Sequence, residues 1–158
     1  MRRLRGERGY SFIELLVVAT ILLILASAVM PLMRVTTQRQ KEMELRRDLR
    51  ILRAAIDKFK DAADAGMISA VDLRPGAEGY PADLDMLVEG ITRANDASGM
   101  KMKFLRRVPI DPMTREAEWG LRSYQDRPDS TSWGGQNVYD VYSKSDGKAL
   151  DGTRYRDW

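Results

Sequence analysis

The sequence predicts an α+β protein: a long N-terminal helix with a transmembrane first half, packed against a small antiparallel β-sheet and a C-terminal loop. Three observations predict it. Residues 15–33 carry no charge, and beyond them apolar residues recur at helical spacing. Two short runs near the C-terminal end are rich in aromatic and β-branched residues, which is typical of strands. Neither the helix nor the sheet buries its apolar face alone, so the two are expected to pack together.

The uncharged segment is long enough to cross a membrane. Its 19 residues make roughly 28 Å of helix, close to the ~30 Å thickness of a bilayer's hydrocarbon core. Four arginines and one glutamate in residues 1–9 precede it, which predicts a cytoplasmic N-terminus. Glu14 stands directly before the segment, where a charge is costly, and is therefore a candidate functional residue.

Composition excludes several classes of function. Residues 1–9 hold 4 of the 26 basic and 1 of the 23 acidic residues, so the rest of the chain is neutral and nucleic-acid binding is not expected. The chain has no cysteine and no histidine, which excludes a thiol nucleophile, a histidine general base and a zinc site of the usual ligands. We predict that the chain is not an enzyme.

The elements beyond the apolar segment follow from spacing and turn residues. One helix is expected over residues 10–65, because an apolar stripe continues in steps of three and four residues. The stripe consists of Leu45, Leu49, Leu52, Ile56 and Phe59. A short helix is expected over residues 82–89, ended by Gly90. Strands are expected over residues 118–124 and 137–143, and the prolines in residues 108–112 predict extended backbone there.

The residues alone leave three interpretations of the N-terminal segment. It is a simple membrane anchor, a secretory signal peptide cut after Ala28 in the stretch Ala26-Ser27-Ala28, or a segment with a further use. The first two do not explain Glu14, since an anchor or a disposable signal functions better without a charge.

A resemblance supports the third interpretation. Residues 9–16, GYSFIELL, resemble the class III signal of type IV pilins and of the pseudopilins of type II secretion. The resemblance implies that a prepilin peptidase removes residues 1–9 by cutting between Gly9 and Tyr10, and that Tyr10 is then N-methylated. Phenylalanine is usual in the family at the position of Tyr10. Glu14 is the fifth mature residue on this interpretation.

The same resemblance implies filament assembly. In a filament of parallel helices, Glu14 of one subunit would meet the α-amine of Tyr10 on its neighbour, and this pair would fix the register of the two subunits. Pro31 either kinks the helix or ends the span near the membrane interface. In the family a proline stands at this place, and the helix can extend there in the filament.

Three later motifs are similar to the major pseudopilins of type II secretion. They are GYP at residues 79–81, LDML at residues 84–87 and FLRRVPIDP at residues 104–112. The absence of a cysteine pair also favours a pseudopilin over a type IV pilin. The resemblance implies a span over residues 10–33 in the inner membrane and a periplasmic head over residues 34–158. It implies a homopolymer whose partners are minor pseudopilins, the peptidase and methylase, and an inner-membrane assembly platform. A type IV pilin of a surface filament remains the alternative.

The C-terminal loop has two interpretations. Asp146-Gly147 and Asp151-Gly152 are turn pairs, since an aspartate side chain accepts hydrogen bonds from its own backbone. The major pseudopilins also have a calcium-binding loop after the last strand, and the resemblance implies calcium ligands at Asp146 and Asp151, with Asp157 as a third. Calcium takes six to eight oxygen ligands, and the spacing here is not that of an EF-hand.

Overall fold

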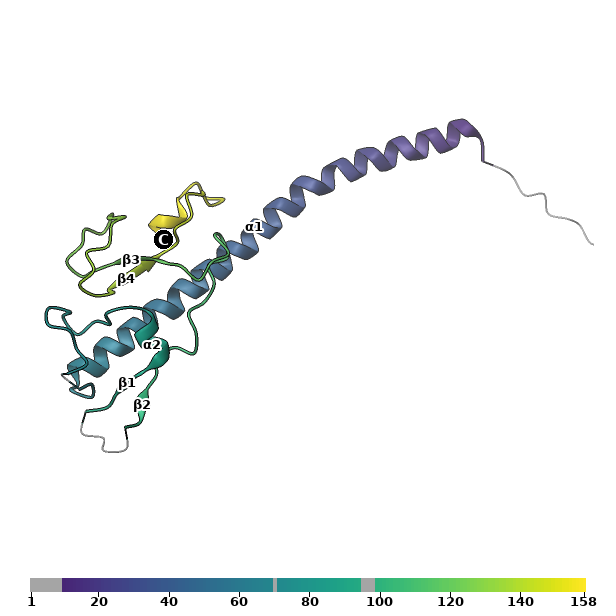
Figure 1. The fold of residues 1–158 in the computed structure, drawn as a ribbon. Coiled ribbons are helices and arrows are strands. Elements are labelled where there is room, and N and C mark those ends of the chain that lie inside the picture. Colours follow the sequence, from purple (N-terminus) through teal and green to yellow (C-terminus); the bar gives the residue numbers. More distant parts are fainter. Residues whose placement is uncertain (1–9, 70, 95–98) are drawn as a thin grey trace, which may run out of the picture. The chain divides into compact units, whose positions relative to one another are not determined.

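The computed structural model describes residues 10–69, 71–94 and 99–158, with the side chains of residues 28–32 outside the description. Figure 1 shows the order of the elements, which begins with the helix α1 (Phe12–Asp64) and continues with the helix α2 (Asp85–Glu89). The chain divides into two compact units, Met1–Gln38 and Arg39–Trp158. The first half of α1 belongs to the first unit, and every other element belongs to the second.

The long helix is confirmed almost to its predicted ends. It begins after Ser11, whose carbonyl oxygen accepts hydrogen bonds from the N–H groups of Glu14 and Leu15 at 3.0 and 3.2 Å. It ends at Asp64 and is terminated by Gly66, which adopts a positive φ of 67°. The N–H of Gly66 donates to Ala63 O, and the next N–H, that of Met67, donates to Ala62 O, both at 2.9 Å. This pair of bonds is the Schellman motif, which satisfies the last carbonyls of a helix.

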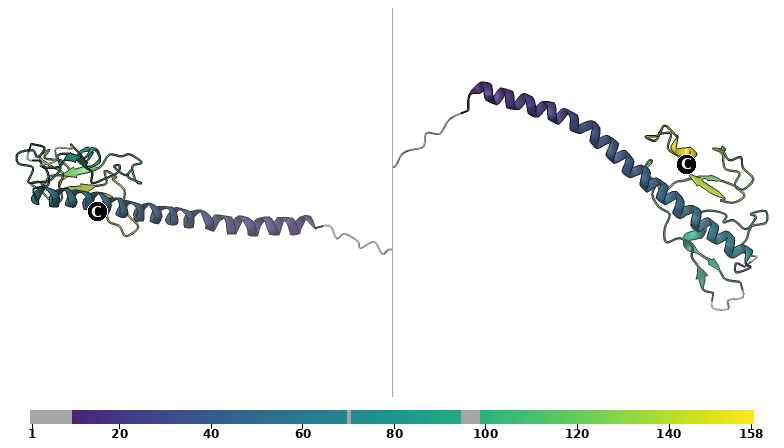
Figure 2. Two further views of the ribbon diagram at one scale, coloured as in Figure 1. Left: turned by 90° about the horizontal axis from the view of Figure 1, so that it is seen from below. Right: turned by 180° about the vertical axis from the view of Figure 1, so that it is seen from behind.

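The predicted apolar stripe forms the core of the second unit. Leu45, Leu52, Ile56 and Phe59 have no exposed surface, and Leu49 is 2 % exposed. They pack in one cluster with buried side chains from the later elements, including Trp119, Val138, Val141 and Tyr155. Figure 2 shows these elements covering one face of the second half of α1.

The short helix is shorter than predicted. The sequence predicts residues 82–89, and α2 contains the last five of them, Asp85–Glu89. Before it, the carboxylate of Asp83 accepts a hydrogen bond of 2.8 Å from the N–H of Met86. An aspartate that accepts a bond from the N–H three residues on caps the start of a helix, so the helix begins after Asp83. Gly90 ends the helix with a φ of 81°, as expected.

The strands form two antiparallel pairs rather than one sheet. The strands β3 (Gly120–Arg122) and β4 (Asp140–Tyr142) lie within the two predicted runs and pair Leu121 with Val141. The pair of β1 (Ile91–Thr92) with β2 (Lys101–Met102) was not predicted. Strands of two residues are too short to show alternation in a sequence.

Candidate functional site

The first part of α1 exposes apolar side chains on all sides. Between residues 12 and 25, eleven large apolar side chains are 48–80 % exposed. A helix that is apolar all round is normally enclosed by protein or lipid, and an exposed apolar surface of this extent marks an interaction site. This part of the molecule therefore needs surroundings that the chain's own first unit does not supply.

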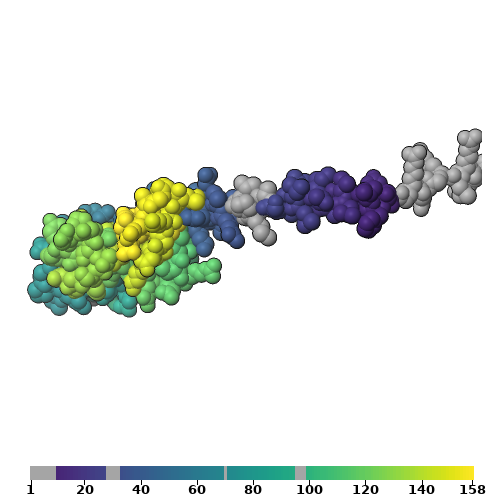
Figure 3. All heavy atoms as spheres, turned by 90° about the horizontal axis from the view of Figure 1, so that it is seen from above, coloured from purple at the N-terminus to yellow at the C-terminus, as the bar shows by residue number. Residues whose placement is uncertain are grey.

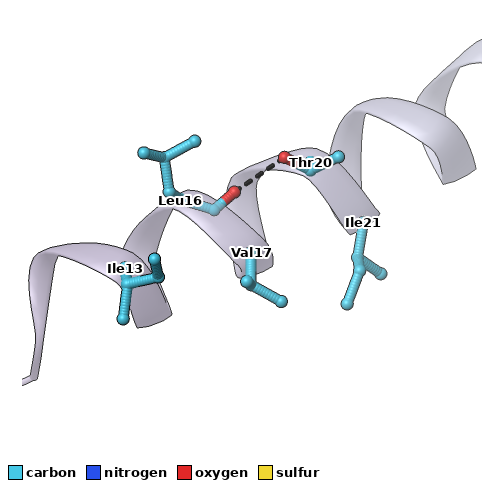
Figure 4. A pocket seen from close by; sticks show the side chains of 5 residues that line it. All are labelled: Ile13, Leu16, Val17, Thr20 and Ile21. Carbon is cyan, nitrogen blue, oxygen red and sulfur yellow. Dashed lines mark hydrogen bonds between the residues drawn. The ribbon is translucent and has the colours of Figure 1, made fainter.

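One face of this segment is hollowed. Ile13, Leu16, Val17, Thr20 and Ile21 line a shallow groove of about 270 Å³, and Figure 4 shows their side chains. The hydroxyl of Thr20 donates a hydrogen bond of 2.8 Å to Leu16 O. The hydroxyl of Thr20, the one polar side-chain group that lines the groove, is thus hydrogen-bonded within the helix. The rest of the groove surface is apolar. Its shape and chemistry suit an apolar side chain or an acyl chain.

Glu14 is the acidic residue of the first turn of α1. A carboxylate there is favoured by the unpaired N–H groups at the start of a helix. Within the described part of the chain, its side chain takes part in no ion pair. Tyr10 lies just before the helix and is 77 % exposed. Among the described residues, Glu14 thus presents a carboxylate without a cationic partner beside a strongly apolar surface.

The two remaining residues of the predicted N-terminal site are described only in part. Gly9 lies outside the described residues, so only the Tyr10 side of the predicted cleavage junction is described. Pro31 lies within α1, which continues helically to Asp64. The helix therefore does not end at Pro31, and its side chain lies outside the description. When length and mean hydropathy are considered together, no helix in the described residues qualifies as a membrane span.

Two aspartates of the C-terminal loop, Asp146 and Asp151, lie beside basic residues. Arg156 Nη2 lies 2.5 Å from Asp146 Oδ1. Asp151 Oδ1 accepts hydrogen bonds from the N–H and the hydroxyl of Thr153, at 2.9 and 2.6 Å, and Arg46 Nη2 lies 3.5 Å from Asp151 Oδ2. The Thr153 hydroxyl and N–H, with Arg46 beside them, lower the pKa of Asp151 below its ordinary value of 3.8. The turn predicted at Asp151-Gly152 is present.

These residues do not fit a calcium site. Asp146 and Asp151 are each occupied as described, and Asp157 lies exposed in the short 3-10 helix η1 (Tyr155–Asp157). Among the described residues, no three acidic or histidine side chains gather closely enough to hold a metal ion. The calcium site stays a prediction, without support from the arrangement of its expected ligands.

Three residues of α1 anchor this loop, and sequence reasoning missed all of them. Glu42 Oε1 accepts hydrogen bonds from Leu150 N at 2.9 Å and from the Tyr155 hydroxyl at 3.1 Å. Arg53 Nη2 donates to Trp158 O at 2.6 Å. The third residue is Arg46, whose guanidinium carbon lies 4.0 Å from the centre of the Trp158 ring. Figure 3 shows the C-terminal residues as a continuous yellow patch on this face of the second unit.

A second missed group links α1 to the strands. Asp140 of β4 binds Arg53 Nε at 2.7 Å and Arg122 Nη1 at 3.3 Å. Arg122 is 7 % exposed and lies with its guanidinium carbon 4.1 Å from the centre of the Tyr142 ring. These charges are spread along the sequence among many similar ones, so no local pattern identifies them.

Comparison with known proteins gives one match. Residues 4–30 match the family model described as the prokaryotic N-terminal methylation motif. No curated protein and no solved structure matches the chain.

The motif supports a type IV pilin-like protein. The match covers Gly9, Tyr10 and Glu14 together with the exposed apolar surface. The motif is typical of proteins that a prepilin peptidase processes and that assemble into filaments. The long helix followed by small antiparallel strand pairs is consistent with the α+β fold of such proteins.

Proposed function

We propose that this chain is a structural subunit of the type II secretion pseudopilus. It is held in the inner membrane with its N-terminus in the cytoplasm and its head in the periplasm. After the removal of residues 1–9 it polymerises with copies of itself, and the growing filament drives the export of folded proteins. The chain catalyses no reaction, and its partners are minor pseudopilins, the prepilin peptidase and methylase, and the inner-membrane assembly platform.

One observation carries the proposal: the residues that match the methylation motif include an apolar helical segment that is exposed on all sides. Lipid covers such a helix before assembly, and the helices of neighbouring subunits cover it afterwards. The groove at residues 13–21 supports packing between subunits, because an apolar side chain of a parallel helix fits it.

Glu14 has a defined role in this proposal. Cleavage before Tyr10 creates an α-amine that is charged at neutral pH. The amine and the carboxylate are each costly in an apolar filament core, and they are tolerated there when paired. The two groups lie four residues apart in one chain. When the amine of one subunit pairs with the carboxylate of its neighbour, the two subunits are therefore shifted along the filament axis by a fixed amount.

A type IV pilin of a surface filament is the second candidate, because the methylation motif serves both classes. The motif at residues 104–112 and the lack of cysteine favour the pseudopilin. The test is to delete the gene in its own host and to follow both exported enzymes and surface filaments. Exported proteins retained in the periplasm support the pseudopilus. Normal secretion with loss of surface filaments establishes the pilin instead, and no change in either overturns both candidates.

A further inference from the structure

Two of the three aspartates of the C-terminal loop, Asp146 and Asp151, lie beside arginines of the chain itself. We propose that Arg46 and Arg156 neutralise this loop and that it folds without a bound metal ion. The inference concerns residues 143–158 and their contacts with α1, so it does not depend on the filament function.

Arg156 closes the loop from its far end. Its guanidinium reaches back ten residues in sequence to Asp146. The Nε atom of Arg156 is buried, so the side chain lies within the fold rather than extended in solvent. Its backbone is fixed as well, because Arg156 O accepts a hydrogen bond of 3.3 Å from Arg122 Nη2. A positive charge thus lies directly beside the carboxylate of Asp146.

Arg46 acts on the middle of the loop from α1. Its guanidinium contacts both the carboxylate of Asp151 and the ring of Trp158. Trp158 Nε1 in turn donates to Thr153 Oγ1 at 2.7 Å, and its ring packs edge-on against Tyr155 with centroids 5.2 Å apart. One arginine therefore connects the turn at Asp151 to the aromatic residues that follow it.

A calcium ion is disfavoured at these positions for two reasons. A calcium ion would bind only if Asp146 or Asp151 first released its arginine. If the arginine stayed within a few ångströms, its positive charge would repel the calcium ion. The set of oxygen ligands that calcium requires is also not assembled, because no three acidic side chains among the described residues lie close together. Glu42 and Arg53 already hold the loop against α1 without an ion.

The experiment uses the full chain in detergent micelles, with calcium chloride or a calcium chelator added. Limited proteolysis followed by mass spectrometry measures the rate of cleavage within residues 143–158. We expect the unmutated chain to be cleaved at the same rate in calcium and in chelator. Arg156→Gln and Arg46→Gln are each expected to speed cleavage about two- to fivefold in both conditions, as suits partly exposed ion pairs.

Control variants distinguish the loss of a specific ion pair from nonspecific destabilisation of the fold. Arg127 forms an ion pair with Asp129 in which the two side chains are 85 % and 75 % exposed. Arg127→Gln should therefore leave the rate of cleavage within residues 143–158 unchanged. Arg156→Lys keeps the charge and should restore part of the protection. Circular dichroism checks that α1 stays folded. Slower cleavage of the unmutated chain in calcium overturns the proposal, and so does unchanged cleavage of both glutamine variants.

Discussion

The first part of α1 and the unit Arg39–Trp158 differ in what surrounds their apolar side chains. Along residues 12–25 the large apolar side chains are at least 48 % exposed, whereas farther along the same helix Leu45 and Phe59 have no exposed surface. The same helix is thus exposed near its N-terminal end and buried against other elements near its C-terminal end. The second unit supplies its own core, whereas the first part of α1 is surrounded, on the proposed function, by lipid or by other subunits.

Charged residues differ between the two regions in the same way. Glu14 has no cationic partner within the described part of the first unit. In the second unit, Asp140 is shared by Arg53 and Arg122, and Asp146 is held by Arg156. Changes near the N-terminus should therefore affect processing and assembly, while changes in the second unit should affect stability.

The largest effect is expected at Gly9. Gly9→Val should abolish removal of residues 1–9, because the larger side chain is not expected to fit a peptidase that cuts after glycine. Immunoblotting and mass spectrometry of membranes would then find the unprocessed chain alone. Gly6→Val, a change of the same size in the same leader, should be processed normally. Normal maturation of Gly9→Val would contradict cleavage at this junction.

A large effect on assembly alone is expected at Glu14. Glu14→Val should leave insertion into the membrane intact, because it removes a charge from an apolar segment. Filament yield should fall by at least about tenfold, since the amine of the neighbouring Tyr10 would be left unpaired. Sheared filaments and membrane fractions are quantified in parallel, with Ser27→Ala as a control that removes an uncharged polar group outside the groove. Wild-type filament yield from Glu14→Val would show that the pair is not needed.

A moderate effect on stability is expected at Asp140. Asp140→Asn should lower the free energy of unfolding by about 2–3 kcal/mol, because it leaves two arginines, one of them buried, without their shared carboxylate. Asp129→Asn removes the exposed pair with Arg127 and should change the free energy of unfolding by less than about 0.5 kcal/mol. Chemical denaturation of the full chain in detergent measures both. Equal effects of the two substitutions would show that the Asp140 pairs do not hold the second unit together.

The smallest effect is a dependence on acid. Hydrogen bonds from the N–H groups of Ser123 and Gly134 lower the pKa of Asp126 below 3.8, as Thr153 and Arg46 do for Asp151. A carboxyl whose folded pKa is lowered stabilises the fold above its unfolded pKa, and this contribution is lost as the pH falls through the folded pKa.

Tryptophan fluorescence should therefore stay constant from neutral pH to about pH 4 and change only below it. The signal comes in part from Trp133 and Trp158, which lie near the two aspartates in sequence. Asp126→Asn should reduce the acid change, and a transition between pH 5 and 7 would contradict this assignment.

The sequence predicts the features of this molecule that local pattern controls. The helical stripe from Leu45 to Phe59, the helix ending at Gly90 and the positions of β3 and β4 follow from periodicity and turn residues. The pair of β1 with β2 is too short to leave such a pattern.

The polar anchors were not predictable in the same way. Glu42 meets Tyr155 across 113 positions, and Arg53 meets Asp140 across 87. Nothing in the neighbouring residues marks one charge among many as buried or paired. The calcium prediction rests on closeness in sequence, and it stays a prediction: the structure places Asp146 against Arg156 and Asp151 against Thr153.

The central claim is that the mature chain begins where the methylation motif predicts. Its most direct test is the intact mass and N-terminal peptide of the protein purified from its host's membranes. We expect a chain that starts at Tyr10, carries one added methyl group on the α-amine and retains every later residue. A chain that starts at Val29, as a signal peptide cut after Ala28 would leave, or one that retains Met1 would contradict it.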